Sequence, residues 1–170
     1  MKKRFFAIAI IVILVFSLTS CGNKTFERDN GFSIELPIHY IVLSDLTELV
    51  NPDVQNSSDV TVFTSYVEGL TISVVKTDYI NYGEEPLSNF DRAVVKARDY
   101  QDDYPDTSVY ELLNGIPAVT HKLTSNQTVI MFFFCTDDAN WSVGVSSINE
   151  DVVESKKDTI ISYASSVEVH

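Results

Sequence analysis

The run from Val129 to Cys135 constrains the fold more than any other stretch of this sequence. It is apolar throughout, and alternate residues of a β-strand point to opposite faces of the sheet. Phe132 and Phe134 would therefore share one face, and Met131 and Phe133 the other. A strand that is apolar on both sides lies within a sheet that is covered on both faces. The run therefore predicts a sheet with cover above and below.

Three pairs of alternating runs, each separated by a short turn sequence, predict β-hairpins. Asn30-Gly31 divides the segment Phe26–Pro37, and Asn114-Gly115 divides Val109–Leu113 from Ile116–Leu123. Asn-Gly between alternating runs is the strongest local hairpin signal. The third predicted hairpin pairs Val60–Val67 with Leu70–Lys76 around Glu68-Gly69. Two further strands are predicted, an irregular one over Ile38–Leu43 and one that is apolar on one side over 141–146.

Two helices are predicted from capping residues and apolar spacing. Ser88 followed by Asp91 is a capping-box pattern, and this helix should end before Pro105. Its expected core residues are Phe90, Val94 and Ala97. Asn149 is expected to cap a last helix from Glu150 to about Ser165, with a buried stripe of Val153, Ile160, Tyr163 and Val167. Residues 44–52 could form a short helix or a loop, and residues 79–86 a loop.

This order of elements predicts an α+β fold with a mostly antiparallel sheet. Phe32–Pro37, the segment Asn114–Ala118 before the long apolar strand, and the closing segment Ile160–Ser166 resemble the PsbP family. That family contains extrinsic photosystem proteins and many bacterial lipoproteins of unknown role. The resemblance covers about Phe26 to Val169 and implies an α/β/α sandwich. It transfers no catalytic residue, and it does not imply a photosynthetic function.

The N-terminus has the three parts of an export signal. Three basic residues at positions 2–4 precede the apolar run Phe5–Leu18, which is shorter than the roughly 20 residues of a membrane-spanning helix. Leu18-Thr19-Ser20-Cys21 resembles the lipobox of bacterial lipoproteins. The resemblance implies cleavage between Ser20 and Cys21 and a diacylglyceryl group on the Cys21 thiol. The alternative is an ordinary signal peptide with a cysteine near its cleavage site.

These features predict a signal peptide over residues 1–20, a short tether over 21–25 and one globular domain over 26–170. Without the leader the chain keeps 9 basic and 24 acidic residues, a net charge of −15. Such a charge argues against nucleic-acid binding and against the domain lying flat on anionic lipid. We expect a monomer at the extracytoplasmic face of the cell membrane, held there by lipid on Cys21.

The sequence predicts no catalytic residue, metal site or cofactor. Ser73 and Lys76 have the S-x-x-K spacing of penicillin-interacting enzymes, but the alternating run around them points the two side chains to opposite faces of a strand. The histidines at 39, 121 and 170 lack metal-ligand spacing. Cys135, the cysteine that remains after lipidation of Cys21, is expected to be buried.

The densest acidic stretch, Asp99–Asp106, contains Tyr100 and Tyr104. It has neither the spacing nor the glycine of a calcium loop, and its acids fit a solvated helix end. Tyrosine beside aspartate is common in binding surfaces, so Tyr100 and Tyr104 are predicted to line a partner site. The favoured function is a non-catalytic binding or scaffolding module for an unknown protein or small ligand. The alternative is a carboxylate-dependent hydrolase whose site forms only in the fold.

Overall fold

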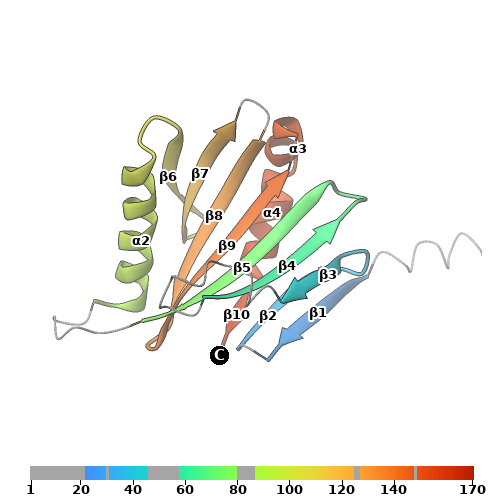
Figure 1. Ribbon diagram of the computed structural model, residues 1–170, viewed down its shortest axis with the longest axis horizontal. Coiled ribbons are helices and arrows are strands. Elements are labelled where there is room, and N and C mark those ends of the chain that lie inside the picture. Colours follow the sequence, from blue (N-terminus) through green and yellow to red (C-terminus); the bar gives the residue numbers. More distant parts are fainter. Residues whose placement is uncertain (1–21, 30, 46–57, 80–86, 125–126, 148) are drawn as a thin grey trace, which may run out of the picture.

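The computed structural model describes residues 22–29, 31–45, 58–79, 87–124, 127–147 and 149–170. Its main feature is a seven-stranded antiparallel sheet in the order β3-β4-β5-β9-β8-β7-β6 (Figure 1). The strands are β3 (Ile41–Asp45), β4 (Ser58–Ser65), β5 (Leu70–Asp78), β6 (Ser108–Leu113), β7 (Ile116–Thr124), β8 (Gln127–Cys135) and β9 (Ala139–Ser147).

A second, three-stranded sheet contains both ends of the described domain. It consists of β1 (Asn23–Arg28), β2 (Phe32–Pro37) and the short β10 (Glu168–Val169), in the order β1-β2-β10. The three predicted hairpins are confirmed as β1–β2, β4–β5 and β6–β7. The irregular strand expected from Ile38 begins instead at Ile41, because the backbone turns first, with the Tyr40 amide donating to the Pro37 carbonyl at 3.0 Å.

The predicted tether is wrong for residues 23–25. Asn23, Lys24 and Thr25 belong to β1 and pair with Pro37, Leu36 and Glu35 of β2, respectively. The alternating run that defines the first hairpin therefore extends further toward the N-terminus than its apolar residues indicate. Only Gly22 lies between Cys21 and the first strand.

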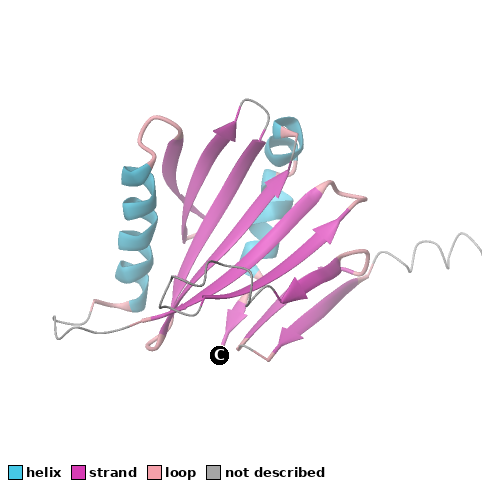
Figure 2. Ribbon diagram, in the orientation of Figure 1, coloured by secondary structure: helices cyan, strands magenta, loops and turns pink. Residues whose placement is uncertain are grey.

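Helices and the small sheet cover the seven-stranded sheet on its two faces (Figure 2). The helix α2 (Asn89–Asp103) packs on β6, β7 and β8. On the other face lies a larger core that includes Ile34 of β2, Ile130 and Phe132 of β8, and Ile160 of the C-terminal segment. The prediction from Val129–Cys135 is confirmed, since both faces of β8 are packed, and the fold is an α+β sandwich.

The helix α2 begins as predicted, with the Ser88 side chain accepting from the Asp91 amide at 3.1 Å. The expectation that Phe90 is a core residue is wrong, because its side chain is 51% exposed. The prediction for Ala97 is confirmed, Val94 is half-buried, and the helix also buries Arg92 and Ala93. The small side chains of Ala93 and Ala97 let the helix lie close to the sheet, which leaves the Phe90 ring at the edge of the contact.

The predicted C-terminal helix is interrupted once. It consists of α3 (Glu150–Ser155), capped by Asn149 as expected, and α4 (Lys157–Ser165), with the break at Lys156. Val153, Ile160 and Tyr163 are buried, and Val167 is partly buried against the same core. The expected stripe is therefore correct although the helix is not continuous.

The leader over residues 1–20, Cys21, and most of the segments predicted over 44–52 and 79–86 lie outside the described residues. Within the described ranges, no helix combines the length and apolarity needed to cross a membrane.

Candidate functional site

The structure brings Tyr100 and Tyr104 together at the C-terminal end of α2, with ring centroids 5.3 Å apart. Both contact His121 of β7, a buried residue. The Tyr100 hydroxyl and His121 Nδ1 share a hydrogen bond of 2.9 Å, and the Tyr104 ring lies 4.5 Å from the imidazole. Tyr100 is half-buried against Phe133, whereas Tyr104 is 47% exposed. Of the two predicted residues, Tyr104 is the more exposed to solvent.

Tyr100 and His121 lie in surroundings that favour their neutral forms. Burial, and then the neighbouring Tyr104, raise the pKa of Tyr100, and burial lowers the pKa of His121. His121 lies across from Ser108 of β6, and the Ser108 hydroxyl donates to the Tyr104 carbonyl at 2.6 Å. The contact of His121 with the two tyrosines could not be predicted from local sequence, because strand pairing brings His121 to the end of α2. The acids in the stretch, at 99, 102, 103 and 106, are all exposed.

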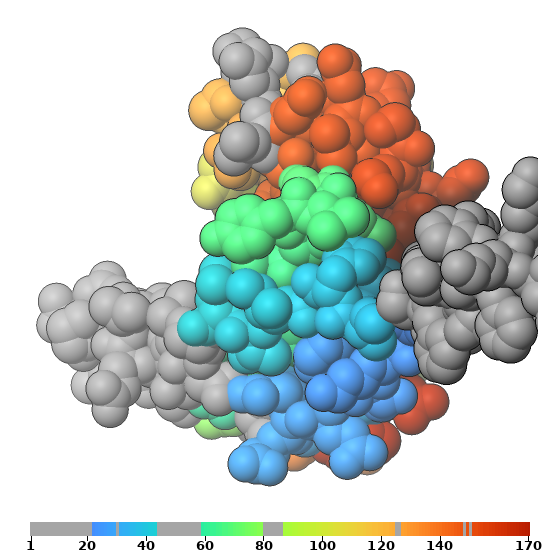
Figure 3. All heavy atoms as spheres, turned by 90° about the vertical axis from the view of Figure 1, so that its right-hand side faces the viewer, coloured from blue at the N-terminus to red at the C-terminus, as the bar shows by residue number. Residues whose placement is uncertain are grey.

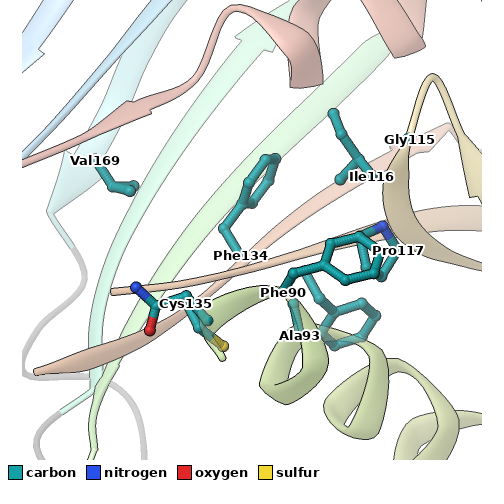
Figure 4. Close-up of a pocket in the computed structure, with 10 residues that line it drawn as sticks. Phe90, Ala93, Gly115, Ile116, Pro117, Phe134, Cys135 and Val169 are labelled. Atoms are coloured by element: carbon teal, nitrogen blue, oxygen red, sulfur yellow. The ribbon is translucent and has the colours of Figure 1, made fainter. Parts of the chain in front are cut away.

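An apolar cavity of about 220 Å³ lies at the opposite end of α2, between the first turn of that helix and the end of β8. Figure 4 shows the exposed Phe90 beside Pro117 at its rim, with Phe134 between Val169 and Ile116. We call this cavity the α2 pocket, and its lining residues are Asn89, Phe90, Ala93, Gly115, Ile116, Pro117, Phe133, Phe134, Cys135 and Val169.

Cys135 forms part of the wall of the α2 pocket and is only partly buried, less than the sequence predicted. Its thiol donates to Asn140 Oδ1 at 3.2 Å. Burial raises the pKa of this thiol and outweighs the opposing effect of Arg92. A thiol with a raised pKa is a poor nucleophile at neutral pH. The pocket is therefore suited to apolar contact, and its cysteine does not resemble a catalytic one.

Arg92 fixes the turn that follows β8. Its guanidinium group stacks on the Tyr79 ring at 3.7 Å, and Nη2 donates to the carbonyls of Thr136 and Ala139. The side chain is buried, which is rare for arginine unless its donors are paired. Sequence reasoning missed this role, because its acceptors are backbone carbonyls more than 40 positions away. Arg92 thereby positions the chain that carries Cys135 into the pocket wall.

A third polar cluster is centred on Glu68, in the turn between β4 and β5. Its carboxylate accepts from the Tyr40 hydroxyl at 2.8 Å and from the Tyr163 hydroxyl at 2.9 and 3.0 Å. His39 Nε2 lies 3.5 Å from Glu68 Oε1. Burial, and next the Glu68 carboxylate, raise the pKa of both tyrosines. The two phenols therefore stay protonated donors, and the cluster joins the β2–β3 loop, the β4–β5 turn and α4.

The other residues weighed in the sequence do not form a site. Ser73 and Lys76 lie on opposite faces of β5, where Ser73 pairs with Gly144 and Lys76 stacks on Trp141 at 5.2 Å. In the described part of the chain, no three His, Cys, Asp or Glu side chains are grouped so that they could hold a metal ion.

Comparison with known proteins supports the fold and assigns no activity to the chain. No protein-family model matches the chain, and no curated protein matches its sequence. The solution structure of cyanobacterial PsbP (CyanoP) from Synechocystis superposes with a TM-score of 0.54 at 13% identity, over 88% of this chain and 94% of that one. A crystal structure from Bacteroides thetaiotaomicron also has a TM-score of 0.54, at 10% identity, over 88% of this chain and 49% of that one.

The Ran-binding protein Mog1p of Saccharomyces cerevisiae is more distant, with a TM-score of 0.48 at 14% identity, over 88% of this chain and 96% of that one. At such identities the likeness concerns architecture alone. The chain has a PsbP-like fold, as its sequence motifs implied.

Proposed function

We propose that this chain is a lipoprotein of the bacterial cell envelope whose PsbP-like domain is a non-catalytic binding module. The lipid on Cys21 anchors it at the extracytoplasmic face of the cell membrane. The observation that carries this proposal is the start of β1 at Asn23, two positions after the lipobox cysteine. Two acyl chains anchor a protein stably, whereas one binds only marginally.

The α2 pocket supports binding more than catalysis. Its lining residues include no carboxylate, and the buried residues of the described part of the chain include no Asp or Glu. A hydrolase of the alternative kind needs two carboxyl groups about 5–10 Å apart in one cavity. A volume of about 220 Å³ is also below the range of roughly 300–1,000 Å³ that is typical of small-ligand pockets. These properties favour an apolar side chain of a protein partner as the occupant.

The lipid anchor is tested by phase separation in a temperature-sensitive detergent. The wild-type chain should enter the detergent phase after expression in a bacterial host, and Cys21→Ala should remain uncleaved at residue 20. If the wild-type chain is cleaved like an ordinary secreted protein and is recovered in the aqueous phase, it carries no lipid. That result would contradict the anchor.

The binding surface is tested by partner capture from detergent-solubilised membranes. Phe90→Ser changes the rim of the α2 pocket, and Val95→Ser is its matched control, since Val95 is 42% exposed on the same helix and does not line the pocket. We expect Phe90→Ser alone to reduce capture, by about tenfold for one well-packed apolar anchor. Equal capture by both variants would contradict the pocket as the binding site.

The predicted Tyr100 and Tyr104 surface is tested in the same assay with Tyr104→Ala. Because α2 has 15 residues, the two surfaces are about 20 Å apart, and one side chain of a partner cannot contact both. Loss of capture with Tyr104→Ala but not with Phe90→Ser would assign recognition to the tyrosines. Unchanged capture after replacing both Tyr100 and Tyr104 by alanine would end that hypothesis.

A further inference from the structure

We propose that one end of the domain rests directly on the bilayer that holds the Cys21 lipid. The contact surface consists of Ile38, in the β2–β3 loop, and Tyr66 and Val67, at the tip of the β4–β5 hairpin. We call these three residues the anchor-side patch. This inference rests on the lipid anchor proposed above, and it adds an orientation and a membrane-binding surface to that anchor.

The path of the chain places the anchor beside this patch. Asn23 pairs with Pro37, and the Ile38 amide donates to the Gly22 carbonyl at 3.1 Å. Gly22 is bonded to Cys21, and consecutive Cα atoms are about 3.8 Å apart. The lipidated residue is thus one peptide unit from a residue that contacts Ile38. A link this short gives the domain little freedom to turn another surface toward the membrane.

The Glu68 cluster holds the hairpin tip against the same loop. Glu68 follows Val67 directly, and its carboxylate binds the Tyr40 hydroxyl while lying 3.5 Å from His39. The pairing of Ile41 with Thr64 continues this contact along the strands. Figure 3 looks at this end of the molecule and shows the β4–β5 hairpin (green) in contact with the segment after β2 (cyan). Loop and hairpin tip therefore form one surface.

The patch is exposed and has the composition of a membrane-interface contact. Tyr66 is 86% exposed, Val67 is 80% exposed, and Ile38 is 49% exposed. Tyrosine is enriched where membrane meets water, because its ring is apolar and its hydroxyl is polar. Tyr66 and Val67 lie in a hydrogen-bonded turn, in which the Gly69 amide donates to the Ser65 carbonyl at 2.8 Å, so they can enter the interface while the backbone keeps its conformation.

Charge limits the contact to this end. The mature chain carries −15, and its exposed acids include Asp151 and Glu154 of α3. Carboxylates more than about 8 Å from the lipid surface are largely screened at physiological salt. Ile38, Tyr66 and Val67 carry no charge, so contact through the anchor-side patch places none of its own side chains in unfavourable electrostatic contact with lipid. This orientation leaves the α2 pocket free for a partner.

The test places a fluorescent reporter at the hairpin tip of the full chain. Tyr66→Trp is the reporter, and Val109→Trp is the matched control, because Val109 is 62% exposed on β6, at the opposite edge of the main sheet from β3. The protein is purified from membranes, its mass is determined to establish lipid on Cys21, and it is placed in phosphatidylcholine vesicles with or without brominated phosphatidylcholine. The parent, whose single Trp141 is 2% exposed, supplies the background.

We expect brominated lipid to quench the Tyr66→Trp signal at least about twofold more than the Val109→Trp signal, since an interfacial group lies about 5–10 Å into the bilayer. Equal quenching in a lipidated protein would overturn the orientation and leave the anchor intact. A blue shift that needs no lipid and grows with protein concentration would assign the tip to a second copy of the chain, and would also overturn it. A mature chain without lipid on Cys21 would overturn the anchor and the orientation together.

Discussion

At the scale of single residues, Glu68 connects parts of the chain that are far apart in sequence. One carboxylate receives hydrogen bonds from Tyr40 and from Tyr163, which is 95 positions away. Both tyrosines are buried. Hydrogen bonds to a charged acceptor contribute more than neutral ones, and breaking them leaves a buried polar atom without its partner. The stability of the anchor-side end should therefore depend on this cluster.

Tyr163→Phe should lower the free energy of unfolding by about 1.5–3 kcal/mol, because it removes the hydroxyl that donates to Glu68. Urea denaturation followed by circular dichroism measures the change. The matched control is Tyr66→Phe, since Tyr66 is 86% exposed and should change stability by less than about 0.5 kcal/mol. An equal effect of the two substitutions would show that the Glu68 cluster contributes nothing measurable.

The same cluster predicts how stability depends on alkaline pH. Burial and the Glu68 carboxylate raise the pKa of Tyr40 and Tyr163 above the ordinary value of about 10. Above that pH the unfolded chain loses these protons while the folded chain keeps them. The free energy of unfolding should thus be steady up to about pH 10 and fall above it, by up to about 1.4 kcal/mol per pH unit for each tyrosine. Tyr163→Phe should make this fall shallower, and an unchanged slope would contradict the assignment.

At the scale of elements, capping and charge stabilise the beginning of α2, whereas the charges in its last turn are unfavourable. Ser88 and Asp91 form a reciprocal cap, with the Ser88 hydroxyl donating to the Asp91 carboxylate at 2.6 Å. The last turn carries no basic residue and contains Asp102 and Asp103, both exposed. Carboxylates are favourable at the positive N-terminal end of a helix and unfavourable at its negative C-terminal end.

Neutralising an acid should therefore have opposite effects at the two ends of α2. Asp103→Asn should raise the free energy of unfolding by about 0.3–1 kcal/mol, and Asp91→Asn should lower it by about 0.3–1 kcal/mol. Thermal unfolding at low and high salt measures both, and the Asp103→Asn effect should shrink with salt. The same sign for both substitutions would contradict the dipole argument.

Close packing of β9 against its neighbours gives a further test. A Cβ atom on Gly144 would lie 2.8 Å from Met131 Sδ and 2.9 Å from Ser73 Oγ. Methionine can move aside, but Ser73 donates to the Gly144 carbonyl and would lose that bond. Gly144→Ala should lower the free energy of unfolding by about 1–3 kcal/mol. Gly22→Ala is the control, because no atom lies within 4 Å of its added Cβ, and comparable losses would contradict the packing argument.

The elements that sequence predicted well are those with local causes. Asn114 and Gly115 have φ of 52° and 79°, the positive values that an Asn-Gly hairpin turn requires. Phe90 was predicted wrongly, because helical spacing identifies a face and does not show where the underlying sheet ends. His121, Arg92 and the Glu68 cluster could not be predicted, because their partners are distant in sequence and meet only through strand pairing and helix packing.

At the scale of the whole molecule, the fold separates two kinds of surface. Ile38 of the anchor-side patch contacts Gly22, and the α2 pocket is built from α2, the β6–β7 turn, β7, β8 and β10. The strongly acidic composition opposes broad contact with anionic lipid. Under the proposed lipid anchor, a PsbP-like domain held at one end would present its pocket and its α2 tyrosines to a partner in the envelope.

The most direct test of this account is the intact mass of the protein extracted from bacterial membranes, together with the mass of its N-terminal peptide. The account predicts a mature chain that begins at Cys21 and carries a diacylglyceryl group on that thiol, so that the folded domain starts two residues from the lipid. A mature chain that begins elsewhere, or that begins at Cys21 with a free thiol, would contradict the central claim and remove the basis for the membrane orientation.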